Sequence, residues 1–240
     1  MFDKLPLSAV RGIRRIGAIG DIHGEDQHLE TALEFLHGSD VDVVLAVGDI
    51  VDGRGDINRC CELLQTHNVL TVKGNHERCL FAGEMRDLPE ATAIEEIDAA
   101  NLDFLFSLPT TRTFKTQFGP LMLCHGLSEY DVAGVWPGDY GYALESNLAL
   151  LRLTLEARFR FVVNGHTHSR MVREFGNLTI VNAGALVHDH NPCFLTLDFE
   201  AGVAEYFNLG GSGTVLRGEE IKLPQPLEGQ EGLGTTVNLP

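Results

Sequence analysis

Short apolar runs that end at glycine and pass directly into polar residues constrain the fold of this chain more than any other feature. The runs end at Gly20, Gly48 and Gly74, and two stretches with apolar residues at helical spacing, 25–37 and 58–66, lie between them. Buried strands that alternate with helices predict parallel strands joined by crossover helices, and hence an α/β fold. Ligands bind such sheets at the carboxyl ends of the strands. The polar residues after each glycine are therefore predicted to form a site.

The second half of the chain predicts a second sheet. We expect two sheets packed face to face with helices outside, in one domain over residues 1–208, and two further helices at 91–108 and 142–158. Residues 209–240 are rich in glycine and proline and are predicted to be an extension of that domain. Four leucines of the last helix recur at helical spacing and predict one apolar stripe. They are Leu144, Leu148, Leu151 and Leu155.

The balance of charge excludes some function classes. The 240 residues include 18 Lys and Arg against 34 Asp and Glu, which gives a net charge of −16. Duplex nucleic acid needs Lys and Arg against its phosphates, so it is not predicted as a partner.

The sequence has no run of about 18 apolar residues and no signal-peptide pattern, so no membrane association is predicted. Five cysteines without a C-x-x-C pair favour a reducing, cytoplasmic location.

Five polar clusters follow predicted strands, and they offer nitrogen and oxygen ligands without thiolate. Such a set suits divalent Mn, Fe, Co, Zn or Ni rather than a structural cysteine–zinc site. Residues two apart in an extended segment point to the same side, so Asp21 and His23 can face one ion. The clusters are GDIHG from Gly20, GDIVD from Gly48, GNHE from Gly74, HG from His125 and GHTH from Gly165.

Seven candidate ligands from these five loops exceed the needs of one four-coordinate ion. Two ions about 3.5–4 Å apart that share a carboxylate use the ligands better. Each cluster alone is weak evidence, because a single D-x-H or H-x-H pattern is often a turn or a surface pair. All five at the ends of predicted strands favour a metal site. The candidate ligands are Asp21, His23, Asp49, Asn75, His125, His166 and His168.

In this order the clusters resemble the signature of the calcineurin-like metallophosphoesterase superfamily, which is GD-x-H, GD-x-x-D, GNH[ED], H and GH-x-H, over residues 16–199. The resemblance implies a four-layer α/β/β/α sandwich with two mixed β-sheets and a dinuclear metal site at the carboxyl ends of the strands. It also implies the two ligand sets. These are Asp21, His23 and His168 for the first metal, Asn75, His125 and His166 for the second, and Asp49 as the bridge.

The resemblance implies a reaction as well. Two divalent ions, with Mn in first place and Fe, Zn, Co, Ni or Mg as alternatives, would lower the pKa of a bound water, and the resulting hydroxide would attack phosphorus. His76 resembles the residue that protonates the leaving group or stabilises the transition state, and Asp52 resembles the residue that orients it. A structural role for His76 and a loop cap at Asp52 are the alternatives.

Two arginines are candidates for binding the substrate phosphate. Related phosphatases and diadenosine tetraphosphatases carry GD-x-V-D-R-G, whereas here Gly53 takes the arginine position and Arg54 follows one place later. Arg54 and Arg78 are each predicted either to contact substrate or to lie on the surface. The glycine-rich loop 126–141 is either a lid whose aromatic residues stack on a nucleobase or a loop whose aromatic residues pack on the protein. The run 188–190, HDH, is predicted to be a surface loop or the rim of the site.

The predicted function is hydrolysis of small phosphate mono- or diesters, with nucleotides among the candidates. Hydrolysis of dinucleoside polyphosphates and dephosphorylation of proteins are alternatives at the same site. A nuclease and a non-catalytic scaffold of the same fold are alternatives from other classes. Two divalent ions bring a charge of about +4 to the carboxylates of Asp21 and Asp49, so a small phosphate ester is compatible with the negative net charge. The sequence leaves open whether the chain is a monomer or a homo-oligomer.

Overall fold

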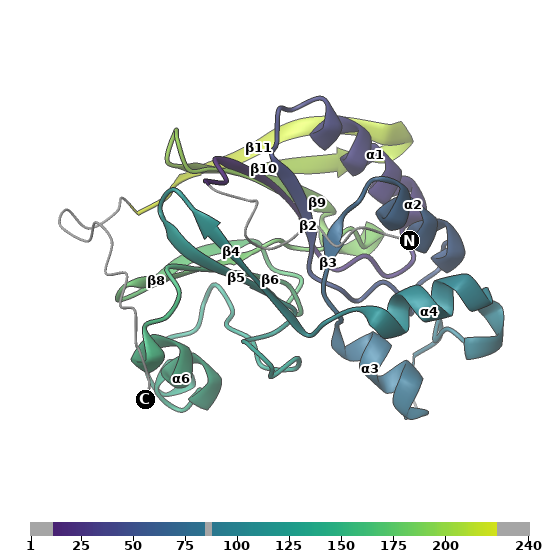
Figure 1. The fold of residues 1–240 in the computed structure, drawn as a ribbon, viewed down its shortest axis with the longest axis horizontal. Coiled ribbons are helices and arrows are strands. Elements are labelled where there is room, and N and C mark those ends of the chain that lie inside the picture. Colours follow the sequence, from purple (N-terminus) through teal and green to yellow (C-terminus); the bar gives the residue numbers. More distant parts are fainter. Residues whose placement is uncertain (1–11, 85–87, 225–240) are drawn as a thin grey trace, which may run out of the picture.

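Two β-sheets lie face to face in the computed structural model, which describes residues 12–84 and 88–224 (Figure 1). The central strands β1 (Arg15–Ile19) and β6 (Phe161–Asn164) are almost wholly buried, which is why they appear in the sequence as continuous apolar runs rather than alternating ones. Helices cover the outer face of each sheet. The predicted four-layer α/β/β/α sandwich with two mixed sheets is confirmed.

The first sheet has six strands in the order β11-β10-β9-β1-β2-β3. Strands β1, β2 and β3 pair in parallel, as the alternation of strands and helices predicted. Strands β9, β10 and β11 pair antiparallel and extend the sheet beyond β1. The other strands of this sheet are β2 (Val43–Ala46), β3 (Leu70–Thr71), β9 (Cys193–Asp198), β10 (Val203–Gly210) and β11 (Thr214–Lys222).

The second sheet has five strands in the order β4-β5-β6-β8-β7. Strands β5, β6 and β8 pair in parallel, and β4 and β7 are antiparallel edge strands that arise from hairpins. The carboxyl ends of β5 and β6 therefore lie at one edge of this sheet. Its strands besides β6 are β4 (Thr111–Thr116), β5 (Gly119–Cys124), β7 (Met171–Phe175) and β8 (Leu178–Asn182).

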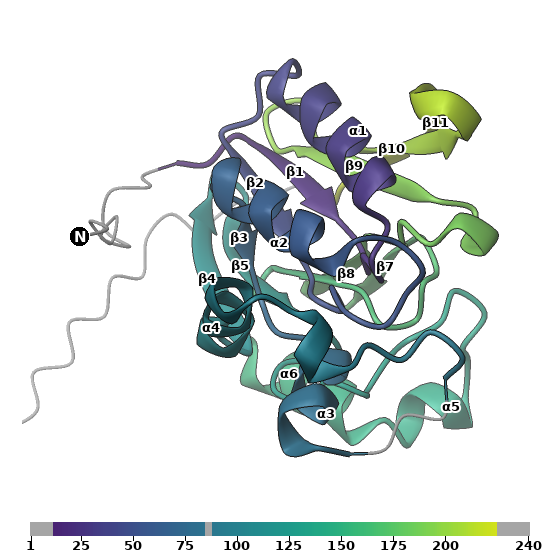
Figure 2. The same cartoon turned by 90° about the vertical axis from the view of Figure 1, so that its right-hand side faces the viewer.

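Four of the helices lie with the first sheet, and Figure 2 shows α1 and α2 side by side. The predicted helices 25–37 and 58–66 are confirmed, whereas 91–108 is a 3₁₀ turn followed by a shorter helix, and α3 was not predicted. No helix within 12–84 or 88–224 has the length and apolar character needed to cross a bilayer. These helices are α1 (Asp26–His37), α2 (Ile57–Thr66), α3 (Asn75–Ala82) and α4 (Ala99–Ser107).

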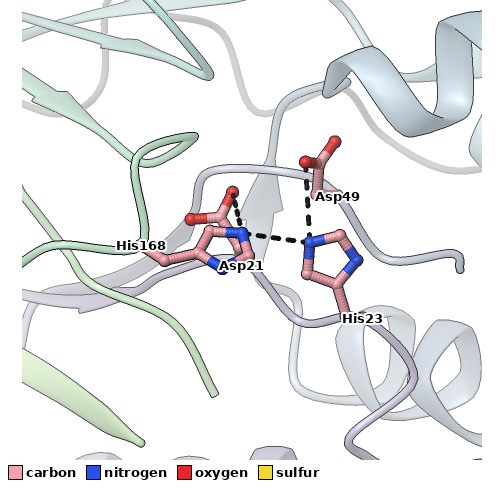
Figure 3. Close-up of side chains that lie close together, drawn as sticks. All are labelled: Asp21, His23, Asp49 and His168. Atoms are coloured by element: carbon pink, nitrogen blue, oxygen red, sulfur yellow. Dashed lines mark hydrogen bonds and ion pairs between the residues drawn. The ribbon is translucent and has the colours of Figure 1, made fainter. Parts of the chain in front are cut away.

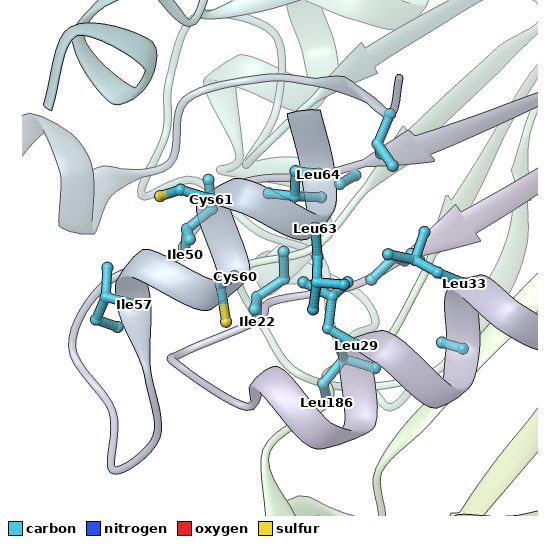
Figure 4. Close-up of a cluster of buried hydrophobic side chains, with 14 of the residues drawn as sticks. Ile22, Leu29, Leu33, Ile50, Ile57, Cys60, Cys61, Leu63, Leu64 and Leu186 are labelled. Carbon is cyan, nitrogen blue, oxygen red and sulfur yellow. The ribbon is translucent and has the colours of Figure 1, made fainter. Parts of the chain in front are cut away.

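Three apolar clusters fill the spaces between the four layers. One lies between the helices and the first sheet, where Leu29 and Leu33 of α1 meet Cys60 and Leu64 of α2 (Figure 4). A second fills the space between the two sheets, and a third lies between the second sheet and the helix α6 (Leu148–Glu156). Burial of apolar surface on this scale is the main source of stability for the fold.

The predicted helix 142–158 is interrupted, and its predicted apolar stripe is wrong. The helix divides into α5 (Tyr142–Glu145) and α6, because the side chain of Asn147 accepts a hydrogen bond from the N–H of Leu150 and starts a new helix. Leu148 and Leu155 are 76% and 75% exposed, whereas Leu150 is buried. Both faces of α6 carry leucine, so spacing alone did not identify the face that packs on the sheet.

The first sheet also continues into the segment 209–240, which the sequence predicted to be an extension. Strand β11 lies in that segment and pairs along its length with β10. The chain reverses at a short glycine-containing turn, Gly211–Gly213, so the glycines join two strands of a hairpin rather than end the domain. The domain boundary predicted at residue 208 is therefore too early, and residues 225–240 lie outside the described residues.

Tyr206 of β10 connects the two sheets through its hydroxyl group. The hydroxyl donates a hydrogen bond to the carbonyl of Asn182 at 2.6 Å and accepts one from the N–H of Met171 at 3.2 Å. Both partners belong to the second sheet, and the Tyr206 side chain is fully buried. Loss of the hydroxyl would remove both hydrogen bonds where water does not reach.

We predict that Tyr206→Phe lowers the free energy of unfolding by about 1–3 kcal/mol, because two buried backbone groups lose their hydrogen bonds. Urea unfolding followed by circular dichroism measures the change. The matched control is Tyr142→Phe, because Tyr142 is 82% exposed and water can take the place of the hydroxyl that this variant loses. Equal unfolding midpoints for the two variants would contradict the role given to the Tyr206 hydroxyl.

Candidate metal centre

The structure brings all seven predicted ligands together at the carboxyl ends of five strands. They follow β1, β2 and β3 of the first sheet and β5 and β6 of the second. Each of the seven has a side-chain oxygen or nitrogen within 4.0 Å of another member of the set. The set is Asp21 and His23 after β1, Asp49 after β2, Asn75 after β3, His125 after β5, and His166 and His168 after β6.

One half of the cluster consists of Asp21, His23, Asp49 and His168, whose ligand atoms lie within 4.8 Å of one another (Figure 3). The Nε2 atoms of His23 and His168 are 3.2 Å apart. Asp49 Oδ2 lies 3.7 Å from His23 Nε2, and Asp21 Oδ1 lies 4.0 Å from His168 Nε2. Two carboxylates and two imidazoles thus converge on one point, as the ligands of a divalent cation do.

The other half of the cluster is centred on Asn75. Its Oδ1 lies 2.9 Å from Nε2 of His125 and 3.1 Å from Nδ1 of His166. His125 Nε2 is also 3.1 Å from Asp49 Oδ2, the same oxygen that approaches His23. One carboxylate oxygen therefore faces both halves, which is the position that a bridging ligand needs.

Two imidazoles of the cluster, those of His23 and His125, are oriented by hydrogen bonds on their outer nitrogens. His23 Nδ1 donates to the carbonyl of Asp52 at 2.9 Å, and His125 Nδ1 donates to the carbonyl of Val47 at 2.9 Å. With Nδ1 bonded to a carbonyl, Nε2 is the atom that faces the cluster in both residues. The donor set, its orientation and the absence of thiolate all fit a divalent cation.

Charge within the cluster supports the same fit. Burial raises the pKa of Asp21 to about 7. Burial would also raise the pKa of Asp49, but the imidazoles of His125, His76 and His23 outweigh it and hold the pKa below its usual range. Burial, followed by the His23 ring, lowers the pKa of His168 to about 3, so His168 is neutral and carries a free lone pair.

The backbone of the site adopts an unusual conformation. His23, Asp49, Asp52, His166 and His168 all have positive φ values, between 46° and 67°. Residues other than glycine rarely adopt this left-handed conformation, and its cost is tolerated mainly at functional sites. The turns that follow the strands are therefore built to aim these side chains rather than to minimise backbone energy.

Glu77, which the sequence analysis did not assign to the site, holds two of its loops together. The carboxylate is fully buried and accepts four backbone N–H groups, at 2.6–3.1 Å. Three of these belong to the loop after β2 and one to Gly74 at the start of α3. The signal in the sequence is a glutamate three residues after Gly74, which directly precedes α3, as in a capping box.

His76 and Asp52 form a hydrogen-bonded pair beside the cluster, as the resemblance implied. His76 Nδ1 lies 2.7 Å from Asp52 Oδ2, and its Nε2 lies 3.8 Å from Asp49 Oδ2. The N–H of Thr92 donates to the other Asp52 oxygen at 2.7 Å, and the Thr92 hydroxyl accepts a hydrogen bond from the Asp52 N–H at 2.8 Å. Burial by itself lowers the pKa of His76. The hydrogen bond to Asp52 and the charges of nearby carboxylates outweigh burial, so the pKa of His76 is raised above its usual value. Thr92 is a second residue that the sequence analysis missed.

The two candidate arginines lie in different surroundings. Arg54 is exposed and borders a cavity of about 330 Å³ that His76 and Asp52 also line, and its Nε donates to Glu90 at 3.0 Å. Arg78 instead forms ion pairs with Asp131 at 2.5 Å and with Glu84 at 3.3 Å. Arg54 is therefore within reach of a molecule in the cavity, and a phosphate contact by either residue stays a prediction.

The glycine-rich loop 126–141 is tied to its surroundings by backbone contacts. The carbonyl of Trp136 accepts a hydrogen bond from Arg173 at 2.9 Å, and its N–H donates to Asp139 at 2.9 Å. Trp136 itself is 47% exposed. The two predicted roles for this loop, a lid over a nucleobase and packing on the protein, both stay predictions.

Comparison with known proteins agrees with the geometry. The family model of the calcineurin-like phosphoesterase superfamily domain matches residues 15–202. A Methanocaldococcus jannaschii protein, named Uncharacterized protein MJ0912, is 34% identical over 101 residues, which are 39% of this chain and 42% of that protein. The alignment thus spans less than half of either chain.

Solved structures share the fold at low sequence identity. A metallophosphoesterase from Sphaerobacter thermophilus has a TM-score of 0.63 and 19% identity over 83% of this chain and 89% of its own. Hypothetical protein PH1004 from Pyrococcus horikoshii has a TM-score of 0.63 and 15% identity over 89% of each chain. The phosphoesterase Yfce from E. coli has a TM-score of 0.52 and 17% identity over 88% of this chain and 100% of its own.

We predict that Glu77→Gln lowers the free energy of unfolding by about 3 kcal/mol and weakens metal binding, because an amide NH₂ would face N–H groups that now meet a carboxylate. Urea unfolding and a Mn²⁺ titration measure the two effects. Glu62→Gln, on the exposed face of α2, is the matched control. Wild-type stability in Glu77→Gln would show that the buried carboxylate does not hold the loops.

Proposed function

Because the chain belongs to the calcineurin-like phosphoesterase superfamily, we propose that it is a metal-dependent hydrolase of small phosphate mono- or diesters, with nucleotides among its substrates. The observation that carries this proposal is the arrangement of Asp49. A single oxygen of this carboxylate faces His23 on one side and His125 on the other. A second feature, the hydrogen-bonded pair of His76 and Asp52, lies within 4 Å of the same oxygen.

We assign two divalent metal ions to the site, with Mn as the first choice and Fe, Zn, Co, Ni or Mg as alternatives. Oxygen and nitrogen donors without thiolate support this choice. When bound, the ions would neutralise charge on the phosphoryl oxygens and provide a nucleophile near neutral pH. The proposed ligands are Asp21, His23 and His168 for one ion, Asn75, His125 and His166 for the other, and Asp49 for both.

His76 is proposed to donate a proton to the leaving oxygen. Its Nδ1 is bonded to Asp52, so Nε2 is the nitrogen free to face the substrate. Asp52 fixes the tautomer of the ring and stabilises its charged form, and Thr92 in turn fixes Asp52. The raised pKa of His76 supports this role, because a general acid must carry its proton near neutral pH.

The leaving group is proposed to occupy the cavity beside His76. The cavity, about 330 Å³, is of a size that suits a small ligand. Four carboxylates, those of Glu25, Asp52, Glu90 and Asp189, line it together with Arg54. Negative charges outnumber the arginine there, which supports a neutral leaving group over one that carries further phosphates. The same charge balance, together with the net charge of −16, supports a small ester over duplex nucleic acid.

Hydrolysis of a dinucleoside polyphosphate is the second candidate function. The position of Arg54 at the edge of the cavity favours it, because arginine binds phosphate well. Glu90 already pairs with Arg54, however, and a second phosphate would compete with that carboxylate. We therefore place this activity, and protein dephosphorylation, behind hydrolysis of a small ester.

We predict that Asp49→Ala abolishes hydrolysis of every substrate in a panel, because it removes the ligand that both halves of the cluster share. The panel contains aryl phosphate mono- and diesters, 2′,3′- and 3′,5′-cyclic nucleotides and a diadenosine polyphosphate, each assayed with Mn²⁺. Asp103→Ala, on an exposed position of α4, is the control and should keep full activity. Full activity in Asp49→Ala would overturn the dinuclear site, and no turnover of the panel by the wild-type chain would favour a scaffold.

We predict that His76→Ala lowers kcat by about 10²–10⁴-fold on esters with poor leaving groups and much less on p-nitrophenyl phosphate, because a good leaving group needs little protonation. Bound Mn²⁺ should stay close to the wild-type stoichiometry, since His76 is not among the proposed ligands. His37→Ala, at an exposed position of α1, is the control. An equal loss on all leaving groups would contradict proton donation by His76.

A further inference from the structure

The outer nitrogen of His168 has a different kind of partner from those of His23 and His125. Those two donate to backbone carbonyls, whose position the fold fixes. His168 Nδ1 instead lies 2.8 Å from Nδ1 of His190, and the two ring centroids are 5.0 Å apart. His190 belongs to the HDH run at 188–190, which lies outside the motifs that define the site.

The hydrogen bond between these rings can have only one direction if His168 is a ligand. His168 Nε2 faces the cluster, 3.2 Å from His23 Nε2, so a ligand role requires a lone pair on that atom. The proton of the neutral ring is then on Nδ1 and is donated to His190 Nδ1. Nδ1 of His190 accepts with its own lone pair.

On this basis, which rests on the proposed metal site, we propose that His190 is a positioning residue that fixes the tautomer and the ring orientation of His168. Ligand imidazoles in metal sites usually donate their second N–H to a carboxylate, a carbonyl or water. Here an imidazole on a separate loop takes that place. Its action on the metal goes through His168, so its loss should affect the affinity for metal first and turnover second.

The turn that carries His190 is anchored at both ends. At its start, Glu25 accepts the N–H of His188 at 2.8 Å, and His28 donates to the carbonyl of Leu186 at 2.7 Å. At its end, Arg170 donates to the carbonyl of Asn191 at 2.8 Å. These contacts hold the turn against the loops after β1 and β6, the strands whose carboxyl ends supply Asp21, His23, His166 and His168. An anchored turn can hold a ring in one orientation, which a free surface loop could not.

The pair of rings also borders two hollows in the surface. His168 and His190 line both the cavity of about 330 Å³ beside His76 and a second cavity of about 610 Å³. His190 is itself exposed, so replacing it removes no apolar core contact. Variants at this position should therefore fold, and their effects should report on the hydrogen bond.

Four substitutions separate hydrogen bonding from shape. His190→Asn and His190→Asp keep an oxygen that can accept from His168 Nδ1, whereas His190→Leu fills space without an acceptor and His190→Lys can only donate. Each full-length variant is stripped of metal and titrated with Mn²⁺, and free Mn²⁺ is followed by its EPR signal. Circular dichroism melting confirms that each variant is folded.

We predict that His190→Leu and His190→Lys weaken one of the two Mn²⁺ sites by about 10–100-fold, and that His190→Asn and His190→Asp stay within about threefold of wild type. Hydrolysis by His190→Leu should recover as Mn²⁺ is raised, because the loss is one of affinity. His188→Ala is the control for Mn²⁺ affinity, since its ring stacks on His28 rather than on a ligand.

Three results would overturn the role of His190. Wild-type Mn²⁺ affinity in His190→Leu would mean that water replaces the ring without loss. Equal losses in the leucine and asparagine variants would mean that hydrogen bonding is not what matters, and an equal loss in His188→Ala would point to the turn as a whole. If Asp49→Ala still loses Mn²⁺ and hydrolysis, the proposed function stands although His190 has no such role. If the wild-type chain binds neither Mn²⁺ nor any of the alternative divalent ions, both proposals fall.

Discussion

The carboxylate of Glu77 determines how the two loops that carry Asp49 and Asn75 lie relative to each other. Burying a charged group without water is costly unless it is fully hydrogen-bonded. Glu77 meets this condition by accepting four backbone N–H groups, three from the loop after β2 and one from the start of α3. The carboxylate of Asp49, the amide of Asn75 and the ring of His76 lie on the two loops that these hydrogen bonds join.

Members of the cluster come from both sheets, so the packing of the sheets and the geometry of the cluster depend on each other. His125 extends from the second sheet and donates to the carbonyl of Val47 in the first. The N–H of His166, also from the second sheet, donates to Asp21 at 2.9 Å. Tyr206 makes a comparable connection away from the site. A shift of one sheet against the other would separate the two halves of the cluster.

The sequence predicted the layers and the seven residues that lie together in the cluster because the relevant pattern is local. A glycine at the end of a strand and a polar residue directly after it lie together in the chain and in space. The features it missed depend on distant partners. Glu77 bonds to residues 26–28 positions away, and His190 contacts a residue 22 positions away. Leucines on both faces of α6, such as Leu148 and Leu150, gave no signal for the buried face. Gly211 and Gly213 belong to the glycine-rich segment that suggested an extension, but they form a hairpin turn.

The left-handed turns limit which sequences could carry this site at all. Positive φ at His23, Asp49, Asp52, His166 and His168 strongly disfavours β-branched residues on conformational grounds, before any question of chemistry arises. Aspartate, asparagine and histidine tolerate this backbone better than most residues and are also the oxygen and nitrogen ligands of divalent cations. The backbone conformation and metal chemistry thus favour the same few residue types. A random substitution at one of these positions would therefore have to tolerate the left-handed backbone and also supply the required side-chain chemistry, and few residue types do both.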